Sequence, residues 1–156
     1  TFLLSKSYCT GGPIAIWNCD TYFSCSTLLE EQLNQAHDGV VPCGHMDGDH
    51  WSFFRTDANQ ILVEAVEKKR ISDWASVGYY YFKDQKRIFK LAEKVLSGAP
   101  PKGLSEYYVS SLYPELLKEG AKIKVCSVDE FRPFGTPKEV EEVWGVGLDE
   151  LKSENV

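Results

Sequence analysis

Short apolar runs separated by polar turns occupy most of the chain, and they predict strands. A buried strand is expected over residues 13–19, because a short apolar run that is in part β-branched ends there at Asp20. Further strands are expected over residues 40–46, 51–55, 61–66, 75–82 and 122–128. The strands over 51–55 and 61–66 are separated by a short polar turn and should pair as a hairpin.

A helical period appears after the first strand. Thr27 and Glu30 have the spacing of a capping box, and Leu29, Leu33 and Ala36 would then share one face. The clearest helix is expected over residues 84–97, where Asp84 is the N-cap, because its apolar side chains recur at helical spacing and Gly98 follows.

Two more helices are expected in the second half. Ser105 would cap a helix that Pro114 kinks and that ends at Gly120. The run Thr136-Pro137-x-Glu139 predicts the start of the last helix, with Thr136 as N-cap and Glu139 three residues later.

The order of these elements indicates the fold class. Several strands between residues 40 and 82 follow one another without intervening helices, unlike a regular βαβ array. We therefore expect an α/β fold, in which a mixed sheet with substantial antiparallel content is flanked by helices. The length of 156 residues suits one domain, over residues 1–145, followed by a polar tail over residues 146–156.

Charge and cysteine content narrow the function classes. The chain carries 17 Lys and Arg against 23 Asp and Glu, a net charge of −6, which disfavours nucleic acid as a partner. No apolar stretch is long enough to span a membrane, so no membrane partner is expected. Five cysteines without close pairs favour reduced thiols and a cytoplasmic location.

Asp20 is a candidate metal ligand, because it directly follows a buried strand. A carboxylate there can hold Mg²⁺ through one or two oxygens. The alternative is that Asp20 caps a turn over residues 21–24.

Glu67 and Lys68 are candidate ligands of a sugar phosphate, because the carboxylate can accept hydroxyl hydrogen bonds and the ammonium can meet the phosphate. A solvated charged turn is the alternative. Gly78 interrupts a strand, which marks either the close approach of a ligand or a bulge. Glu106 lies where the first turn of the helix after Ser105 is expected, and helix-end electrostatics alone would also favour a carboxylate there.

The order of these motifs is more specific than any one of them. Six segments recur in order: Asn18-Cys19-Asp20, Trp51-Ser52-Phe53, Glu67-Lys68-Lys69-x-Ile71-Ser72, the run over 77–82, Ser105-Glu106-Tyr107-Tyr108 and Gly135-Thr136-Pro137-x-Glu139-Val140. In this order the chain resembles the sugar-phosphate nucleotidyltransferases, especially the glucose-1-phosphate thymidylyltransferase-like enzymes of capsule and lipopolysaccharide synthesis. The resemblance runs from Thr1 to Trp144 and corresponds to the later, C-terminal part of such an enzyme.

The resemblance implies a role for each candidate. Asp20 would bind Mg²⁺ near a nucleoside triphosphate, and Glu67 and Lys68 would hold the hydroxyls and phosphate of a sugar 1-phosphate. Gly78 would offer its backbone to the sugar, and Glu106 would accept another sugar hydroxyl. The family joins the two substrates and releases pyrophosphate, mainly by positioning and charge stabilisation.

Two departures from the family pattern bear on activity. The family's glycine-rich loop with Arg and Lys, which holds the nucleotide, has no counterpart in this chain, because Gly11-Gly12-Pro13 has no cation beside it. Pro133 stands where many relatives place an Asp as a second metal ligand.

We therefore expect a truncated domain that binds a sugar phosphate but does not transfer nucleotides alone. The alternatives are a structural or interaction module, and an enzyme completed by a missing N-terminal half. The family's strand equivalent to residues 13–19 is internal, so its exposed edge here predicts a homodimer. A rival expectation is that residues 1–8 fold back as a helix over the gap.

Overall fold

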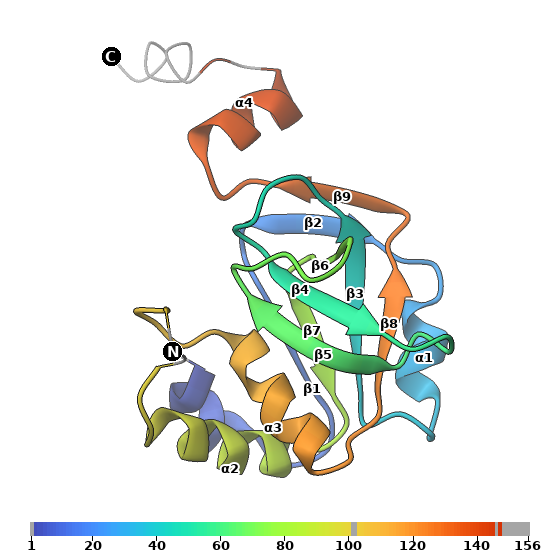
Figure 1. The fold of residues 1–156 in the computed structure, drawn as a ribbon, viewed down its shortest axis with the longest axis vertical. Helices are drawn as coiled ribbons and strands as arrows, with labels where there is room; N and C mark the ends of the chain where they lie inside the picture. The colour runs from blue at the N-terminus through green and yellow to red at the C-terminus, as the bar shows by residue number, and fades with distance from the viewer. Residues whose placement is uncertain (1, 101–102, 146, 148–156) are drawn as a thin grey trace.

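The computed structural model describes residues 2–100, 103–145 and 147, and the predicted tail lies outside these residues apart from Gly147. Figure 1 shows the elements in chain order. The strands are β1 (Ile14–Trp17), β2 (Thr21–Ser24), β3 (Gly39–His45), β4 (Ser52–Thr56), β5 (Leu62–Glu67), β6 (Trp74–Ser76), β7 (Tyr79–Phe82), β8 (Ile123–Ser127) and β9 (Glu130–Pro133). The helices are η1 (Phe2–Tyr8), α1 (Leu28–Leu33), α2 (Gln85–Leu96), η2 (Val109–Leu112), α3 (Tyr113–Lys118) and α4 (Pro137–Trp144), of which η1 and η2 are 3₁₀-helices.

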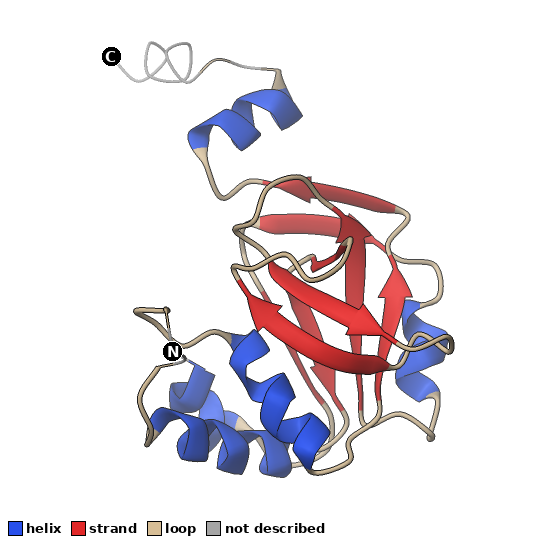
Figure 2. Cartoon of the chain, viewed as in Figure 1, coloured by secondary structure: helices blue, strands red, loops and turns tan. Residues whose placement is uncertain are grey.

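The fold is mixed α/β, as the pattern predicts, with a mostly antiparallel sheet (Figure 2). In the described part of the chain, seven strands form the main sheet in the order β1-β7-β3-β6-β4-β5, and β8 pairs with β3 in parallel. The expected hairpin of β4 and β5 is present. A separate antiparallel ribbon joins β2 to β9, neither of which the sequence pattern predicts.

The strand expected over residues 75–82 is broken in two, because β6 ends at Ser76 and β7 begins at Tyr79. Gly78 between them has a φ of 81°, a left-handed conformation that no regular strand contains. The break lies opposite Pro42 of β3, whose carbonyl accepts the Val77 N–H at 3.3 Å. Pro42 has no N–H to donate, so the ladder between β3 and its neighbours lacks one hydrogen bond at the break.

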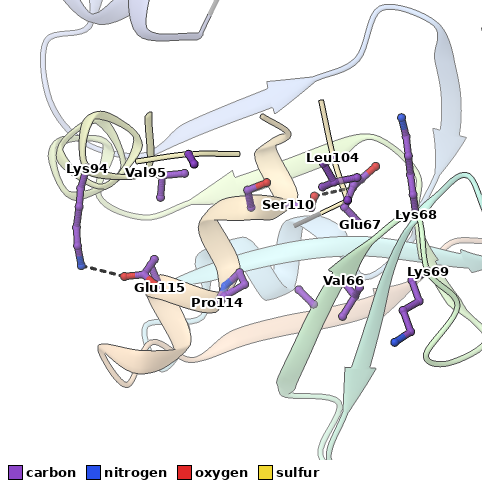
Figure 3. A pocket seen from close by; sticks show the side chains of 14 residues that line it. Val66, Glu67, Lys68, Lys69, Lys94, Val95, Leu104, Ser110, Pro114 and Glu115 are labelled. Atoms are coloured by element: carbon purple, nitrogen blue, oxygen red, sulfur yellow. Dashed lines mark hydrogen bonds and ion pairs between the residues drawn. The ribbon is translucent and has the colours of Figure 1, made fainter. Parts of the chain in front are cut away.

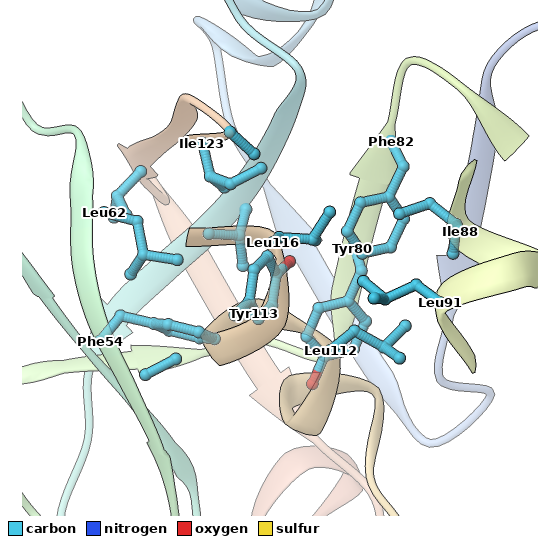
Figure 4. Packing of buried hydrophobic residues seen from close by; sticks show 14 of the residues in the cluster. Phe54, Leu62, Tyr80, Phe82, Ile88, Leu91, Leu112, Tyr113, Leu116 and Ile123 are labelled. Carbon is cyan, nitrogen blue, oxygen red and sulfur yellow. The ribbon is translucent and has the colours of Figure 1, made fainter. Parts of the chain in front are cut away.

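The core lies between the main sheet and the helices α2 and α3, as Figure 4 shows. Its centre is Tyr113, which is completely buried and contacts the rings of Phe54, Tyr80 and Phe82 at centroid distances of 5.2, 6.2 and 5.7 Å. The sheet therefore has one face covered by helices of the second half of the chain.

Two helix ends agree with the sequence. The Asp84 carboxylate accepts hydrogen bonds from the N–H groups of Lys86 and Arg87 at the start of α2. Thr136 and Glu139 form a complete capping box at the start of α4. In Figure 1, α4 stands away from the sheets at the end of β9.

Two other helix predictions are wrong. Thr27 has helical angles, φ −91° and ψ −6°, and makes no cap hydrogen bond, so α1 has no capping box. Leu29 and Leu33 are each 67% exposed rather than buried, and Ala36 lies outside the helix. The helix expected from Ser105 begins instead at Val109 as η2, after an irregular segment.

Pro114 also does not kink a long helix, because α3 begins one residue earlier and Pro114 occupies its first turn. A proline is tolerated there, since its missing N–H would have no partner within the helix. Glu106 therefore lies in the irregular segment before η2 and not in the first turn of a helix.

The N-terminal segment does form a helix, but it packs on α2. Phe2 stacks on Phe89 at 4.7 Å, and Lys6 pairs with Glu93 at 2.5 Å. Among the described strands, β1 has a single partner, β7, and so forms one edge of the main sheet. No helix in the described residues is both long and apolar enough to cross a membrane.

Candidate functional site

A cavity of about 260 Å³ lies between the main sheet and the β2–β9 ribbon. Asp20 and Gly78 line it from the turns after β1 and β6, and Glu67 and Lys68 line it from the end of β5. The structure therefore brings four of the five predicted site residues to one cavity. Glu106, the fifth, does not line it.

Glu67 is held by two hydroxyl groups. Its Oε2 atom accepts hydrogen bonds from Ser52 of β4 and, at 2.6 Å, from Ser110 of η2. These serines are buried, at 8% and 3% exposure, so they fix the carboxylate firmly and tie η2 to the sheet. Both bonds use the same oxygen, and the second oxygen of Glu67 takes part in neither.

Lys68 follows β5 with a φ of 53°, an uncommon backbone conformation for a residue other than glycine. Its Nζ donates a hydrogen bond to the Tyr108 hydroxyl and lies 4.6 Å from the centre of the Tyr108 ring. The bond to Tyr108, with the charges of Glu67 and Glu106 nearby, raises the pKa of Lys68 above its ordinary value. The side chain is therefore a positioned cation at neutral pH.

Glu106 contacts this site by a hydrogen bond with Tyr108. Its Oε2 atom accepts a hydrogen bond of 3.4 Å from the Tyr108 hydroxyl, the same group that receives the Lys68 ammonium. In this arrangement Glu106 orients Tyr108 at the border of the cavity. Tyr108 is thus a site residue that the sequence reasoning did not single out, although it belongs to the run Ser105-Glu106-Tyr107-Tyr108.

Gly78 is required by its neighbour Asn18. A Cβ at Gly78 would lie 2.8 Å from the Asn18 side-chain nitrogen, closer than van der Waals contact allows. The Gly78 carbonyl accepts the Asn18 N–H at 2.8 Å, and the Gly78 N–H donates to Ser76 Oγ at 3.1 Å. Both backbone groups already have partners within the chain, so close packing explains the glycine.

Asp20 faces the loop before α4. Its carboxylate oxygen would lie 3.2 Å from a Cβ at Gly135, and the Asp20 carbonyl accepts the Phe134 N–H at 2.8 Å. Glu139 also lines the cavity, and its Oε2 accepts the Thr136 N–H at 2.8 Å. Asp20 and Glu139 thus place two carboxylates on one wall, while Pro133 on the same wall offers no side-chain ligand.

The described residues contain no group of three or more His, Cys, Asp or Glu side chains that could hold a metal ion. Two carboxylates with open space beside them nevertheless fit the usual mode of Mg²⁺, which takes one or two carboxylates, and water and phosphate oxygens for the rest. The pair therefore fits a Mg²⁺ ion whose remaining ligands come from outside the chain.

Aromatic side chains border the same cavity. His50 lies against Trp51 at a ring distance of 4.3 Å, and Trp51 contacts Phe131 of β9 at 5.8 Å. Trp51 therefore links the start of β4 to the ribbon. Trp51 belongs to one of the six ordered motifs. Its contact with Phe131 could not be predicted, because the sequence pattern did not indicate the β2–β9 ribbon.

A larger groove, of about 720 Å³, adjoins the cavity on the far side of Glu67 and Lys68 (Figure 3). Its walls come from β5, from the end of α2 and from η2 and α3, and they are mostly apolar. Lys94 and Glu115 pair across it at 2.9 Å. The paired ammonium groups of Lys118 and Lys94 lower the pKa of Glu115 to about 2.

Sequence comparison with protein-family models finds no match, and comparison with curated proteins finds none either. Solved structures, in contrast, are similar over most of the chain. A nucleoside-diphosphate-sugar pyrophosphorylase from Vibrio cholerae RC9 is 25% identical, with a TM-score of 0.75, over 92% of this chain and 60% of that one.

Two further structures share the fold at lower identity. A protein described as a glucose-1-phosphate thymidylyltransferase from Bacillus anthracis, in complex with sucrose, is 17% identical with a TM-score of 0.72. It is matched over 90% of this chain and 56% of its own. The inositol-1-phosphate CTP transferase from T. maritima is 14% identical with a TM-score of 0.67, over 92% of this chain and 58% of its own.

The chain thus spans between 56% and 60% of the length of these solved proteins. Their names agree with the resemblance carried by the ordered motifs. The chain has a partial nucleotidyltransferase fold.

Proposed function

We propose that the cavity around Glu67 and Lys68 binds a sugar 1-phosphate, and that the chain is the sugar-phosphate-binding part of a nucleotidyltransferase of polysaccharide synthesis. The observation that carries this proposal is the pairing of a positioned cation with a fixed carboxylate on one cavity wall. The ammonium is matched to the phosphate, and the unused oxygen of Glu67 to a sugar hydroxyl.

Solvent exposure separates the two halves of this site. Glu67 is half-buried and fixed by serines, which suits the selection of one hydroxyl position. Lys68 is exposed apart from its contact with Tyr108, so a phosphate reaches it without burying an unpaired charge. An inorganic phosphate alone would meet only half of the site, so a sugar phosphate should bind more tightly.

Asp20 and Glu139 would hold Mg²⁺ when a nucleoside triphosphate is present. The ion would offset the charge of the phosphate groups, as metal ions do in phosphoryl transfer. In this proposal, Asp20 and Glu139 line the wall of the cavity beside which the ion and the triphosphate would lie. The sequence contains no glycine-rich loop with Arg and Lys of the kind that holds the nucleotide in the family it resembles, so we propose that the 156-residue chain does not release pyrophosphate alone.

Calorimetric titration with glucose 1-phosphate tests the proposed site. Replacing Lys68 with Ala should weaken binding by about tenfold to a hundredfold, because a charged hydrogen bond contributes roughly 1.5–3 kcal/mol. The matched control is Lys69→Ala, which removes the same charge from the neighbouring position, outside the cavity lining. Equal affinities of the two variants would refute the assignment of Lys68.

A pyrophosphate-release assay tests the second claim. Purified chain with Mg²⁺, glucose 1-phosphate and each common nucleoside triphosphate should give no turnover above background. Turnover that Asp20→Asn abolishes would refute this claim, because the chain would then catalyse the reaction without another chain or segment.

The exposed edge strand β1 supports a second role, the interaction of two copies of the chain. The edge strand β1 carries exposed Ala15 and Trp17, and Trp17 remains 55% exposed although it contacts Phe23 and Tyr79. We propose that two copies pair through this edge, since an unguarded apolar edge favours strand addition. Sedimentation should give a dimer for the parent chain and a monomer for Ala15→Lys. A parent chain that is strictly monomeric at tens of micromolar would contradict the proposal.

The cysteines support a reducing, cytoplasmic location for this function. All five thiols are free, and two of them, Cys43 and Cys126, are buried. A secreted protein would be expected to pair them. Thiol counting on protein isolated from its natural cell, with an alkylating reagent present from lysis onward, should give five free thiols.

A further inference from the structure

Two cysteines that are far apart in the sequence lie next to each other, one after the end of β2 and one in β8. Cys25 follows β2, and Cys126 lies in β8. Their Sγ atoms are 3.5 Å apart, and the Cys25 thiol also lies 3.3 Å from the Ser127 carbonyl oxygen. This pair cannot be predicted from spacing in the sequence, because 101 positions separate the two residues.

The two thiols differ in access. Cys25 is partly exposed, whereas Cys126 is 3% exposed and packs within the sheet. Burial, together with the nearby Cys25, raises the pKa of the Cys126 thiol well above its usual range. Because Cys25 is the more exposed of the two thiols, an oxidant from solvent reaches Cys25 first, and Cys126 lies beside it as the second thiol.

We propose that Cys25 and Cys126 form a disulfide when the chain meets a peroxide. Hydrogen peroxide converts the Cys25 thiol to a sulfenic acid and releases one water. The Cys126 thiol then attacks the Cys25 sulfur, the S–O bond breaks and the S–S bond forms, and the Cys126 proton joins the departing hydroxyl group as a second water. Each sulfur loses one electron, and the two peroxide oxygens gain them.

The bond would fasten the ribbon to the main sheet. Ser24 and Ser26, on either side of Cys25, already bond to Asp129 in the turn between β8 and β9, through the Ser24 carbonyl and the Ser26 N–H. The backbone on either side of Cys25 is thus tied to the turn after β8 before oxidation, and the two sulfur atoms must close from 3.5 Å to the roughly 2 Å of a disulfide. The same ribbon begins beside Asp20, so the disulfide restrains one wall of the cavity.

Peptide mapping of the folded chain tests the proposal. The chain is treated with hydrogen peroxide, alkylated and digested without reductant, and the fragments are identified by mass spectrometry. We expect a linked pair containing Cys25 and Cys126, lighter than the two free peptides by two hydrogens, and a fall in free thiols from five to three. Cys25→Ser should lose the link, while Cys19→Ser, an exposed control, should keep it.

Amide hydrogen exchange gives a second measurement on the parent chain. Oxidation should slow exchange in β2 and β9, and added reductant should reverse the effect. Three results would overturn the proposal: five thiols remaining after treatment, Cys25 oxidised without a link, or Cys126 linked to the buried Cys43 of β3 instead.

Discussion

Replacing Gly78 with Ala tests the packing on which the cavity depends. Gly78 has a φ of 81°, and a Cβ there would lie 2.8 Å from the Asn18 side chain. The left-handed conformation costs a non-glycine residue about 1–2 kcal/mol, and forcing Asn18 aside adds about 1–3 kcal/mol. We therefore expect the free energy of unfolding to fall by about 2–5 kcal/mol.

Gly12 provides the matched control. It also has a positive φ, of 93°, but no atom lies within 4 Å of a Cβ built on it. Gly12→Ala should therefore show the conformational cost without the steric cost, about 1–2 kcal/mol. The difference between the two variants isolates the contact with Asn18.

Urea unfolding followed by tryptophan fluorescence measures both variants, and the double variant Gly78→Ala with Asn18→Gly should recover the steric part. The reasoning is refuted if Gly78→Ala is no less stable than Gly12→Ala. It is also refuted if removal of the Asn18 side chain recovers nothing, because the cost would then arise from another contact.

Further predictions concern a carboxylate, a cap and a buried hydroxyl. Because the pKa of Glu115 is lowered, its contribution to stability is complete above pH 4.5 and is lost as the pH falls towards 2. Glu115→Gln should therefore reduce the change of melting temperature with pH over that range, whereas Glu142→Gln on α4 should leave this pH dependence unchanged. Thr136→Ala removes the cap of α4, so hydrogen exchange measured by fragment should show that the free energy of opening of α4 falls by about 1 kcal/mol. Equal protection of α4 in the parent and the variant would contradict this prediction. The Tyr113 hydroxyl is buried without a hydrogen-bond partner among the described residues, so Tyr113→Phe should raise the free energy of unfolding by about 1 kcal/mol, and a loss of that size would reveal a partner.

Local signals in the sequence predicted the parts of the fold that depend on neighbouring residues. Asp84 and the Thr136–Glu139 box specify α2 and α4 through contacts made within one turn. The β4–β5 hairpin likewise follows from two apolar strands with a short polar turn between them. These elements need no information from distant segments.

The errors arise where a distant segment decides the structure. The break at Gly78 depends on Asn18 and on Pro42 of another strand, and β2 exists because β9, more than 100 residues later, pairs with it. The exposed leucines of α1 show the same effect, since a helical period alone does not reveal whether a partner surface lies nearby.

The candidate site contains some positions that the sequence predicted correctly and one that it did not. Asp20, Glu67, Lys68 and Gly78 meet in one cavity, as the ordered motifs implied. The position of Glu106 behind Tyr108 did not follow from sequence, because it depends on an irregular segment in place of the expected helix.

The most direct test of the account is a map of where a sugar 1-phosphate binds. Two-dimensional NMR of ¹⁵N-labelled chain, titrated with glucose 1-phosphate, reports this residue by residue. The account predicts that the amide signals of Ser52, Glu67, Lys68, Gly78 and Tyr108 shift together with one dissociation constant, and that glucose alone shifts them less. Signals that shift only in the adjoining groove near Lys94, or none that shift at all, would contradict it.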